Sequence, residues 1–260
     1  MRFLIVKKQN MKINKTFILS LIVLILSAIV LIIFVNNHSS IVENNQPKKK
    51  TSSYNYVGER IQYLINPLGK SEYSNLGVVD LKGVKVNLVI FKTDVLFFQD
   101  TEKIYSDLES SLPLKIERTI LKLWGKESIT EEYDQKEFTV TIRKFNGNKI
   151  IYEKKAKAKG PIFNAITLPF YLRGHFDLKI GWSFIARVPE EFKLEVVSID
   201  EIVIPAGKFL AYHFKSIPDK FEIWINKNNP RVPLKIQGKG FFDYALLMKK
   251  YVLVNPPAQD

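Results

Sequence analysis

The feature that most constrains this 260-residue chain is an uninterrupted apolar run over residues 17–35. The run reads FILSLIVLILSAIVLIIFV and contains no charge, proline or glycine. As a helix, its roughly 19 residues would span about 28 Å, close to the ~30 Å hydrocarbon core of a bilayer. We therefore predict one transmembrane helix at 17–35, preceded by a basic cytoplasmic lead at 1–16.

The charges on either side of this run predict its orientation. Five basic residues and no acid precede it, whereas the next basic residues after it are Lys48–Lys50. Basic residues favour the cytoplasmic side, so the main domain should face the periplasm or the exterior of a bacterial cell as a single-pass inner-membrane protein. A cleaved signal peptide is the alternative, but the run is long for one and lacks a small-residue cleavage site, which favours a retained signal anchor.

Composition divides the rest of the chain and limits its chemistry. Residues 36–53 are polar and contain Pro47, which is typical of a flexible tether, and 255–260 should be a frayed tail. Between them, 54–254 is long enough for one domain with its own core. The chain has no cysteine, which excludes a lipoprotein, disulfides and cysteine metal sites.

The basic character of the chain is shared between two parts. Residues 1–53 carry +7 of the net charge of +13, leaving +6 for the domain. We therefore expect no nucleic-acid partner; an anionic lipid surface is the favoured electrostatic partner, and simple solubility is the alternative. Four lysines, Lys154, Lys155, Lys157 and Lys159, could contact anionic headgroups or could protect an edge strand from pairing with other chains.

Apolar residues alternate with period two through much of the domain, which predicts antiparallel strands with one buried face. The alternating sets are Ile61–Ile65, Val84–Phe91, Phe138–Arg143, Phe192–Ser198 with even-numbered residues sharing a face, and Leu210–Lys215. Asn146-Gly147 predicts a tight hairpin, and Pro205-Ala206-Gly207 predicts a three-residue hairpin loop with a glycine bulge. Two segments, Ile104–Ile116 and Ile223–Ile236, share a hydrophobic-Pro-Leu-Lys-Ile ending and predict two similar hairpins, each with its proline at a strand start or edge.

The segment Pro161–His175 is apolar without clean alternation. Pro161 could start a helix, Gly174 could end one, and Pro169 should interrupt it, which predicts two short pieces or one kinked helix. We expect this segment to plug the concave face of a curved, β-rich α+β sheet or half-open barrel. Either it is ordinary core, or its side chains line a hollow for an acyl chain; the candidate lining residues are Ile162, Phe163, Ile166, Leu168, Phe170 and Leu172.

Several of these pieces together resemble the bacterial family known as domain of unknown function 3108. The matching segments, which follow one another along most of the domain, are Val57–Tyr63, Ile104–Ile116, Leu168–Arg173 with Gly181–Phe184, Ile204–Phe209, and Ile223–Ile236. The resemblance implies an exported, β-rich domain whose shape is similar to the half-open barrel of periplasmic lipoprotein carriers. It implies no catalytic residues.

No motif in the chain predicts catalysis. The three histidines, His38, His175 and His213, have no metal-ligand spacing, and the acidic groups at Glu131–Asp134 and Glu190–Glu191 are typical of solvated loops. Trp124, Trp182 and Trp224 should be core or sheet anchors. We expect no enzyme, cofactor or metal; the domain should bind an apolar or amphiphilic, lipid-like ligand or assist envelope assembly. The alternative is a structural module that docks a membrane complex without a ligand pocket.

Overall fold

A computed structural model describes residues 56–175, 177–239 and 243–254, all of which belong to one compact unit, Ser40–Asp260. The predicted anchor, lead, tether, tail and His38 lie outside the described residues. Within them, no helix is both long and apolar enough to cross a membrane.

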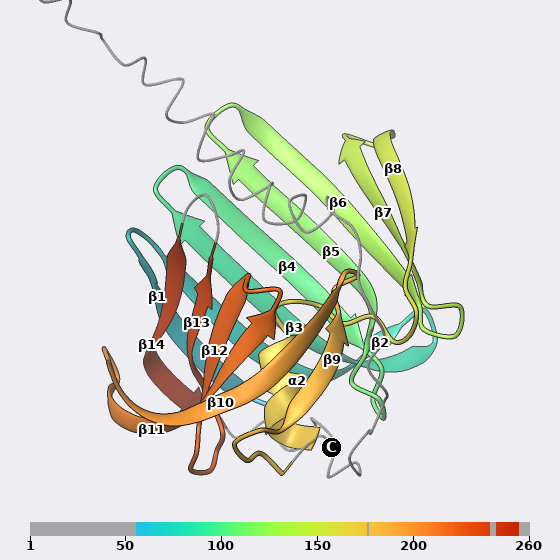
Figure 1. The fold of residues 1–260 in the computed structure, drawn as a ribbon. Coiled ribbons are helices and arrows are strands. Elements are labelled where there is room, and N and C mark those ends of the chain that lie inside the picture. Colours follow the sequence, from blue (N-terminus) through green and yellow to red (C-terminus); the bar gives the residue numbers. More distant parts are fainter. Residues whose placement is uncertain (1–55, 176, 240–242, 255–260) are drawn as a thin grey trace, which may run out of the picture. The chain divides into compact units, whose positions relative to one another are not determined.

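Fourteen strands form one open sheet (Figure 1). The first eight are β1 (Glu59–Asn66), β2 (Lys70–Leu81), β3 (Val84–Val95), β4 (Phe98–Ser106), β5 (Pro113–Lys122), β6 (Gly125–Asp134), β7 (Thr139–Asn146) and β8 (Lys149–Lys157). After the helix α2 (Leu168–His175) come β9 (Ser183–Arg187), β10 (Glu191–Ile204), β11 (Gly207–Ile217), β12 (Phe221–Asn226), β13 (Pro233–Gly238) and β14 (Tyr244–Leu253). For the described residues, the prediction of an antiparallel, β-rich fold with a short helix is confirmed.

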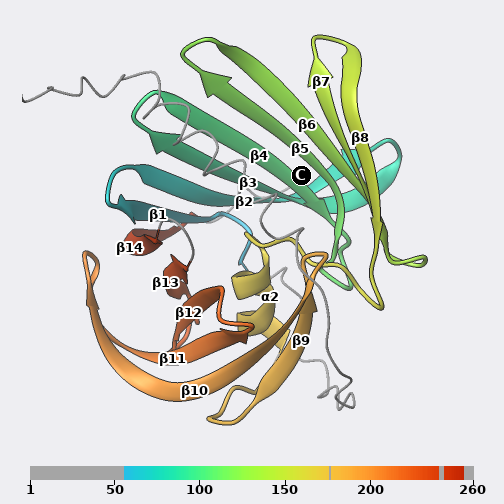
Figure 2. The same cartoon turned by 45° about the horizontal axis from the view of Figure 1, so that its top comes forward.

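The strand order shows how the chain builds the sheet. The order is β8-β7-β6-β5-β4-β3-β2-β1-β14-β13-β12-β11-β10-β9, and every neighbouring pair is antiparallel. The chain therefore starts in the middle, meanders to one edge at β8, crosses through α2 to the opposite edge at β9, and meanders back until β14 pairs with β1. Figure 2 shows β9–β14 curling around α2, while β3–β8 extend beyond it.

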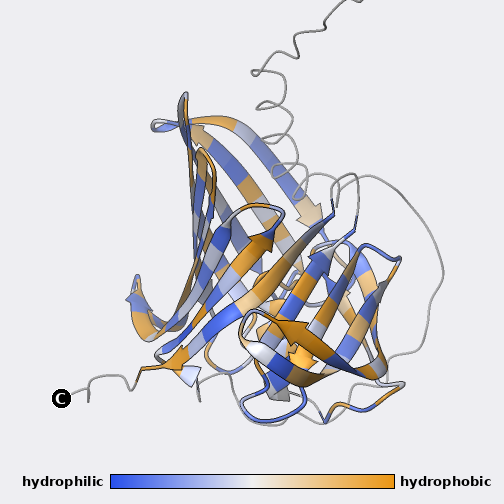
Figure 3. Ribbon diagram, turned by 90° about the vertical axis from the view of Figure 1, so that its left-hand side faces the viewer, coloured by the Kyte–Doolittle hydropathy of each residue, from blue (hydrophilic) through white to orange (hydrophobic). Residues whose placement is uncertain are grey.

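The alternation of the sequence appears in Figure 3 as alternating orange and blue bands along the strands. It correctly predicts the buried faces of β1 and β7. Ile61 and Tyr63 are buried on β1, and their neighbours Arg60 and Gln62 are exposed. The Asn146-Gly147 hairpin is present, with Asn146 paired to Lys149.

Other local predictions were wrong in detail. On β10, a bulge between Val196 and Ser198 turns Ser198 to the opposite face, beside His213. The β10–β11 loop holds two residues rather than three, because Ile204 pairs directly with Gly207. Gly207 does have the expected positive φ, +130°. The long β10–β11 hairpin also passes the short β12 and β13, and Ala206 N–H donates to Met248 O at 3.1 Å.

The two predicted similar hairpins are β4–β5 and β12–β13, one in each half of the sheet. Pro113 and Pro233 are the first residues of β5 and β13, where a missing N–H breaks no ladder bond. In each hairpin the pairing register shifts next to the proline, so the two hairpins share this irregularity as well as the sequence pattern.

The helix begins later than predicted. Residues 161–164 are irregular, and α2 starts at Leu168, where Asn164 Oδ1 accepts bonds from the N–H groups of Ile166 and Thr167. Pro169 lies in the first turn of α2, where a proline interrupts no intrahelical bond, so it neither splits nor kinks the helix. Because α2 is only two turns long, packing rather than helix propensity holds it in place.

Two apolar clusters meet at α2. One joins β1–β5 with β10–β14 and includes Phe170. The other joins β9–β12 and includes Leu168 and Leu172. On β3, the odd-numbered residues Val89 and Phe91 pack in the cluster that contains Phe170 of α2. The sequence of β3 did not reveal this face, because both of its faces carry apolar residues. The helix thus fastens the two halves of the sheet to each other.

Candidate functional site

An ion pair fixes α2 against the start of the sheet. Arg173 Nη1 donates to Glu59 Oε1 at 2.7 Å, and Nη2 donates to the other carboxylate oxygen. Both side chains are almost fully buried. Burial opposes the charge of Arg173, but the bonds to Glu59 outweigh it and raise the pKa of the guanidinium. A buried bidentate pair of this kind fixes orientation, because losing either partner strands a charge.

Aromatic rings extend this contact toward the sheet. Phe170 stacks on Tyr73 of β2 with ring centroids 3.7 Å apart, and Tyr56 lies over the Arg173 guanidinium at 3.9 Å. Arg173 is therefore enclosed between Tyr56 and Phe170, and its Nε has no hydrogen-bond partner. These rings form the rigid wall of a small opening beside α2.

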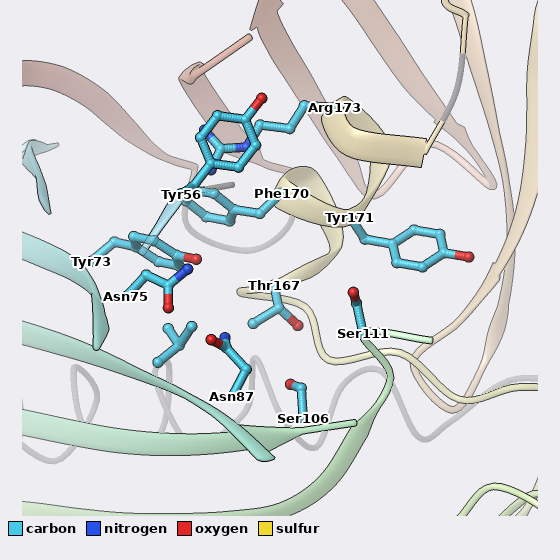
Figure 4. A pocket seen from close by; sticks show the side chains of 11 residues that line it. Tyr56, Tyr73, Asn75, Asn87, Ser106, Ser111, Thr167, Phe170, Tyr171 and Arg173 are labelled. Atoms are coloured by element: carbon cyan, nitrogen blue, oxygen red, sulfur yellow. The ribbon is translucent and has the colours of Figure 1, made fainter. Parts of the chain in front are cut away.

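That opening, called the cleft below, is lined mainly by neutral polar groups. Asn75, Asn87, Ser106 and Thr167 point into a shared space below Phe170 and Tyr73 (Figure 4). Its interior volume is about 30 Å³, which is room for only one or two waters or one polar group of a ligand. The cleft is lined by Tyr56, Tyr73, Asn75, Asn87, Val89, Ser106, Ser111, Thr167, Phe170, Tyr171 and Arg173.

Besides Arg173 Nε, one acceptor in the lining has no hydrogen-bond partner. Asn87 is 6% exposed, and its Oδ1 accepts no hydrogen bond. Asn75 differs, because its Oδ1 accepts from Gly77 N–H at 3.1 Å. A buried acceptor left unbonded costs free energy, so the cleft favours a donor at this position. The ionisable residues among the lining are Tyr56, Tyr73, Tyr171 and Arg173.

A second polar group lies farther along the same face of the sheet, on β4–β6. Glu102 pairs with Phe91, which pairs with Tyr73, so it shares the face that Tyr73 presents to α2. Arg118 Nε donates to Asp100 Oδ2 at 2.8 Å and lies 3.4 Å from Glu102 Oε1. Glu131 accepts from Tyr133 Oη at 2.5 Å. We call Asp100, Glu102, Arg118, Glu131 and Tyr133 the ionic cluster.

Burial changes the titration of this cluster. It raises the pKa of Glu102 to about 8, with Asp100 and Glu131 adding to the rise and Arg118 opposing it. Burial likewise raises the pKa of Glu131, although Tyr133 and Arg118 oppose the change. One cation thus faces three carboxyl groups, so Glu102 holds its proton at neutral pH. The expectation that Glu131 belongs to a solvated loop was wrong, because Glu131 lies on β6 and faces inward.

The opposite face of β10–β12 carries the environment of His213. Its Nδ1 lies 2.9 Å from Asp200 Oδ2, and its Nε2 lies 3.0 Å from Glu222 Oε2. Its ring stacks on Trp224 at 4.2 Å, and Lys239 Nζ contacts Glu222 at 2.6 Å. Burial opposes the change, but bonds to Lys239 and His213 lower the pKa of Glu222.

This arrangement is not a nucleophile site. Ser198 Oγ is 3.3 Å from His213 Nδ1, which at first suggests a Ser-His-acid triad. Asp200 is nearer to the same nitrogen, at 2.9 Å, and Glu222 contacts the other at 3.0 Å, so both ring nitrogens have carboxylate partners, whereas in a triad one of them pairs with the serine. Among the described residues, no group of three or more His, Asp or Glu could hold a metal ion.

The structure divides the predicted lining residues among different surroundings. Phe170 lines the cleft. The others lie in packed surroundings: Ile162, Phe163, Leu168 and Leu172 are buried, and Ile166 is partly buried. His175 is the last residue of α2.

The predicted lysines lie at one margin of the sheet. Lys155 and Lys157 alternate on one face of the edge strand β8, Lys154 is half-buried on the other face, and Lys159 follows the strand. Their position on an edge strand fits the protective role, and it is equally open to anionic headgroups.

Sequence reasoning missed the cleft and the ionic cluster. The sequence does show polar residues in the alternation pattern of buried ones. Asn87 shares a strand face with Val89, and Arg118 lies between Ile116 and Ile120 on one face of β5. Among the tryptophans, Trp182 and Trp224 are buried as predicted, but Trp124 is 57% exposed at a hairpin tip.

Comparison with known proteins adds no further assignment. No family model matches the chain, and no curated protein or solved structure is detectably similar to it. The resemblance described from the sequence stays a prediction.

Proposed function

We propose that this chain is a non-catalytic domain, anchored in the bacterial inner membrane by residues 17–35, that binds a lipid-like amphiphile on the outer side of that membrane. The observation that carries the proposal is the cleft, where the unbonded Asn87 acceptor lies beside Asn75 and Thr167 under two aromatic rings. Amide and hydroxyl groups beneath aromatic walls suit a neutral polar headgroup.

The size of the cleft limits the part of the ligand that enters. A volume of about 30 Å³ accepts a hydroxyl or amide group but not an acyl chain. Val89 lines the cleft and pairs with Ile104, which pairs with Ile116, so an apolar row leads away from it across β3–β5. The acyl chain would follow this row by displacing part of the packing there.

In-cell photocrosslinking of the full chain tests this proposal. Cells would incorporate a diazirine fatty acid into their lipids, and adducts would be mapped by peptide mass spectrometry. We expect adducts on β3 or on residues 161–175, in addition to any on 17–35. The substitution Asn87→Leu should abolish the adducts in the domain, whereas Asn228→Leu, in an exposed turn, should keep them. Adducts confined to 17–35 would contradict ligand binding.

A second function, a docking module without a ligand pocket, is favoured by a different observation. Ile162, Phe163, Leu168 and Leu172 pack into the interior, so α2 acts there as structural core. In-cell protein crosslinking that recovers a stoichiometric membrane partner, together with no lipid adducts in the domain, would favour this function.

A further inference from the structure

Four hairpin tips lie along one end of the sheet. In an antiparallel meander, alternate turns fall at the same end, so the β1–β2, β3–β4, β5–β6 and β7–β8 turns are neighbours. Figure 1 shows them in this order along the upper margin of the sheet. We call these four tips the rim.

The rim concentrates exposed apolar side chains. The tip of β3–β4 is Leu96-Phe97, and the tip of β5–β6 is Leu123-Trp124; each of the four side chains is at least 56% exposed. Leu68 lies in the β1–β2 turn, and Ile150 and Ile151 follow the β7–β8 turn, all three exposed. All four tips therefore present large apolar groups outward.

The turns at the opposite end of the same strands differ. They are formed by Lys82-Gly83, by 107–112 and by 135–138, and none of these residues is an exposed large hydrophobic. The residue that follows Lys82-Gly83, Val84, is itself 57% exposed. The two ends of these strands therefore differ in number: seven exposed large hydrophobic side chains lie at the rim, and Val84 lies at the opposite end.

Turn geometry does not explain these residues. Leu96 has φ +49°, a conformation in which glycine, asparagine or aspartate is normally preferred. A leucine there strains the backbone and gains no packing, because its side chain is exposed. Neither the turn geometry nor packing within the described residues therefore accounts for a leucine at this position.

The charges beside the tips indicate the partner. The two strand residues on either side of each turn include four lysines, Lys70, Lys122, Lys126 and Lys149, and one acid, Asp94. Two of these lysines form ion pairs: Lys70 lies 3.4 Å from Asp94, and Lys122, whose side chain is 15% exposed, lies 2.7 Å from Glu127. Lys126 and Lys149 supply the remaining positive charge beside the tips. Exposed tryptophan, phenylalanine and aliphatic groups, flanked by lysines, are the composition that enters the headgroup region of an anionic bilayer.

We propose that the rim is a membrane-contact surface that inserts its apolar tips into an anionic lipid bilayer. The predicted tether permits this: about 18 extended residues reach up to about 60 Å, more than the ~27 Å that the eight residues of β1 cover from its start to the rim. The domain would then lie against the bilayer instead of hanging free from its anchor. This proposal does not depend on ligand binding in the cleft.

Single-cysteine labelling of the full chain tests the rim directly, because the natural chain has no cysteine. Phe97→Cys and Trp124→Cys place an environment-sensitive fluorophore on the rim, and Lys82→Cys and Glu109→Cys place it at exposed positions of the opposite end. Each labelled chain would be reconstituted into phosphatidylcholine vesicles with or without phosphatidylglycerol. Circular dichroism would check that each variant is folded.

We expect the rim labels to shift their emission to the blue and lose most of their quenching by iodide, more strongly with phosphatidylglycerol. The opposite-end labels should stay quenchable. Rim labels that are quenched as readily as those at Lys82 and Glu109 would overturn the proposal, and equal protection in both vesicle types would refute the role of the lysines. The same labelled chains would also be measured in native membranes; protection seen there but in neither vesicle type would indicate a protein partner in place of lipid and would also overturn the proposal.

Discussion

Replacing Glu102 with glutamine should stabilise this domain at neutral and alkaline pH. Glu102 is enclosed in the ionic cluster with a side chain 13% exposed, and its pKa lies near 8 instead of 4.5. Between these two values the folded chain holds a proton that the unfolded chain releases. The free energy of unfolding therefore falls as pH rises through this window. Glutamine keeps the shape of the protonated acid and cannot ionise, so the substitution removes the loss.

The size of the effect follows from the shift. A change from 4.5 to about 8 corresponds to at most about 5 kcal/mol once the pH exceeds 8, at roughly 1.4 kcal/mol per unit. The charges of Asp100, Glu131 and Arg118 all act on Glu102, and the cluster can rearrange when Glu102 ionises, so we expect about half of this limit, roughly 2.5 kcal/mol. At pH 4, below both values, the two proteins should unfold at similar denaturant concentrations.

Urea unfolding from pH 4 to pH 9, followed by tryptophan fluorescence in a non-ionic detergent, measures this difference. The control is Glu132→Gln, the same chemical change on the outer face of β6, where the side chain is 54% exposed and bonded to Arg143. The midpoints of Glu102→Gln should separate from those of the natural chain as pH rises, and those of Glu132→Gln should not. A constant offset at every pH, or a loss of stability at pH 8, would refute the reasoning.

Three further substitutions test other contacts by the same measurement. Glu59→Gln leaves Arg173 buried without its charge partner and should lower the free energy of unfolding by about 3–5 kcal/mol. The double variant with Arg173→Met should recover much of this loss, and no recovery would contradict a paired role. At Gly77, which has φ +81°, an added Cβ would lie 2.7 Å from Val57 Cγ1, so Gly77→Ala should lower the free energy of unfolding by about 1–3 kcal/mol. Gly83→Ala, at a similar φ but in open space, should cost less; equal losses would show that the Val57 contact is unimportant. His213→Gln breaks the bridge between Asp200 and Glu222 and should cost about 1–3 kcal/mol; an unchanged midpoint would refute a bridging role for the histidine.

The sequence predicts the strands well because alternation is local. Ile61 and Tyr63 need only their own neighbours to reveal a buried face, and Pro113 and Pro233 reveal strand starts because proline cannot donate. Ser198 was misplaced because one extra residue in a bulge reverses every later side chain, and the sequence does not show the bulge.

The candidate site was less predictable because its members meet only through tertiary structure. Glu59 and Arg173 are 114 residues apart, and the cleft joins β2, β3 and β4 to α2. Within one strand, Glu102 and Ile104 share a face, which signals an inward carboxyl group but not its partner. The start of α2 was missed because Asn164, rather than Pro161, provides the cap.

The pairing of β1 with β14 has a consequence for assembly. While the chain is being synthesised, β1 can pair with β2 on one edge only. Its other edge stays unpaired until β14 has been made, nearly two hundred residues later. Until then, one edge of β1 presents unpaired backbone donors and acceptors to strands of other chains, which favours aggregation. Removing 244–254 should therefore do more than shorten the sheet: it should leave a permanent gap at its centre and produce aggregation instead of a smaller, soluble fold.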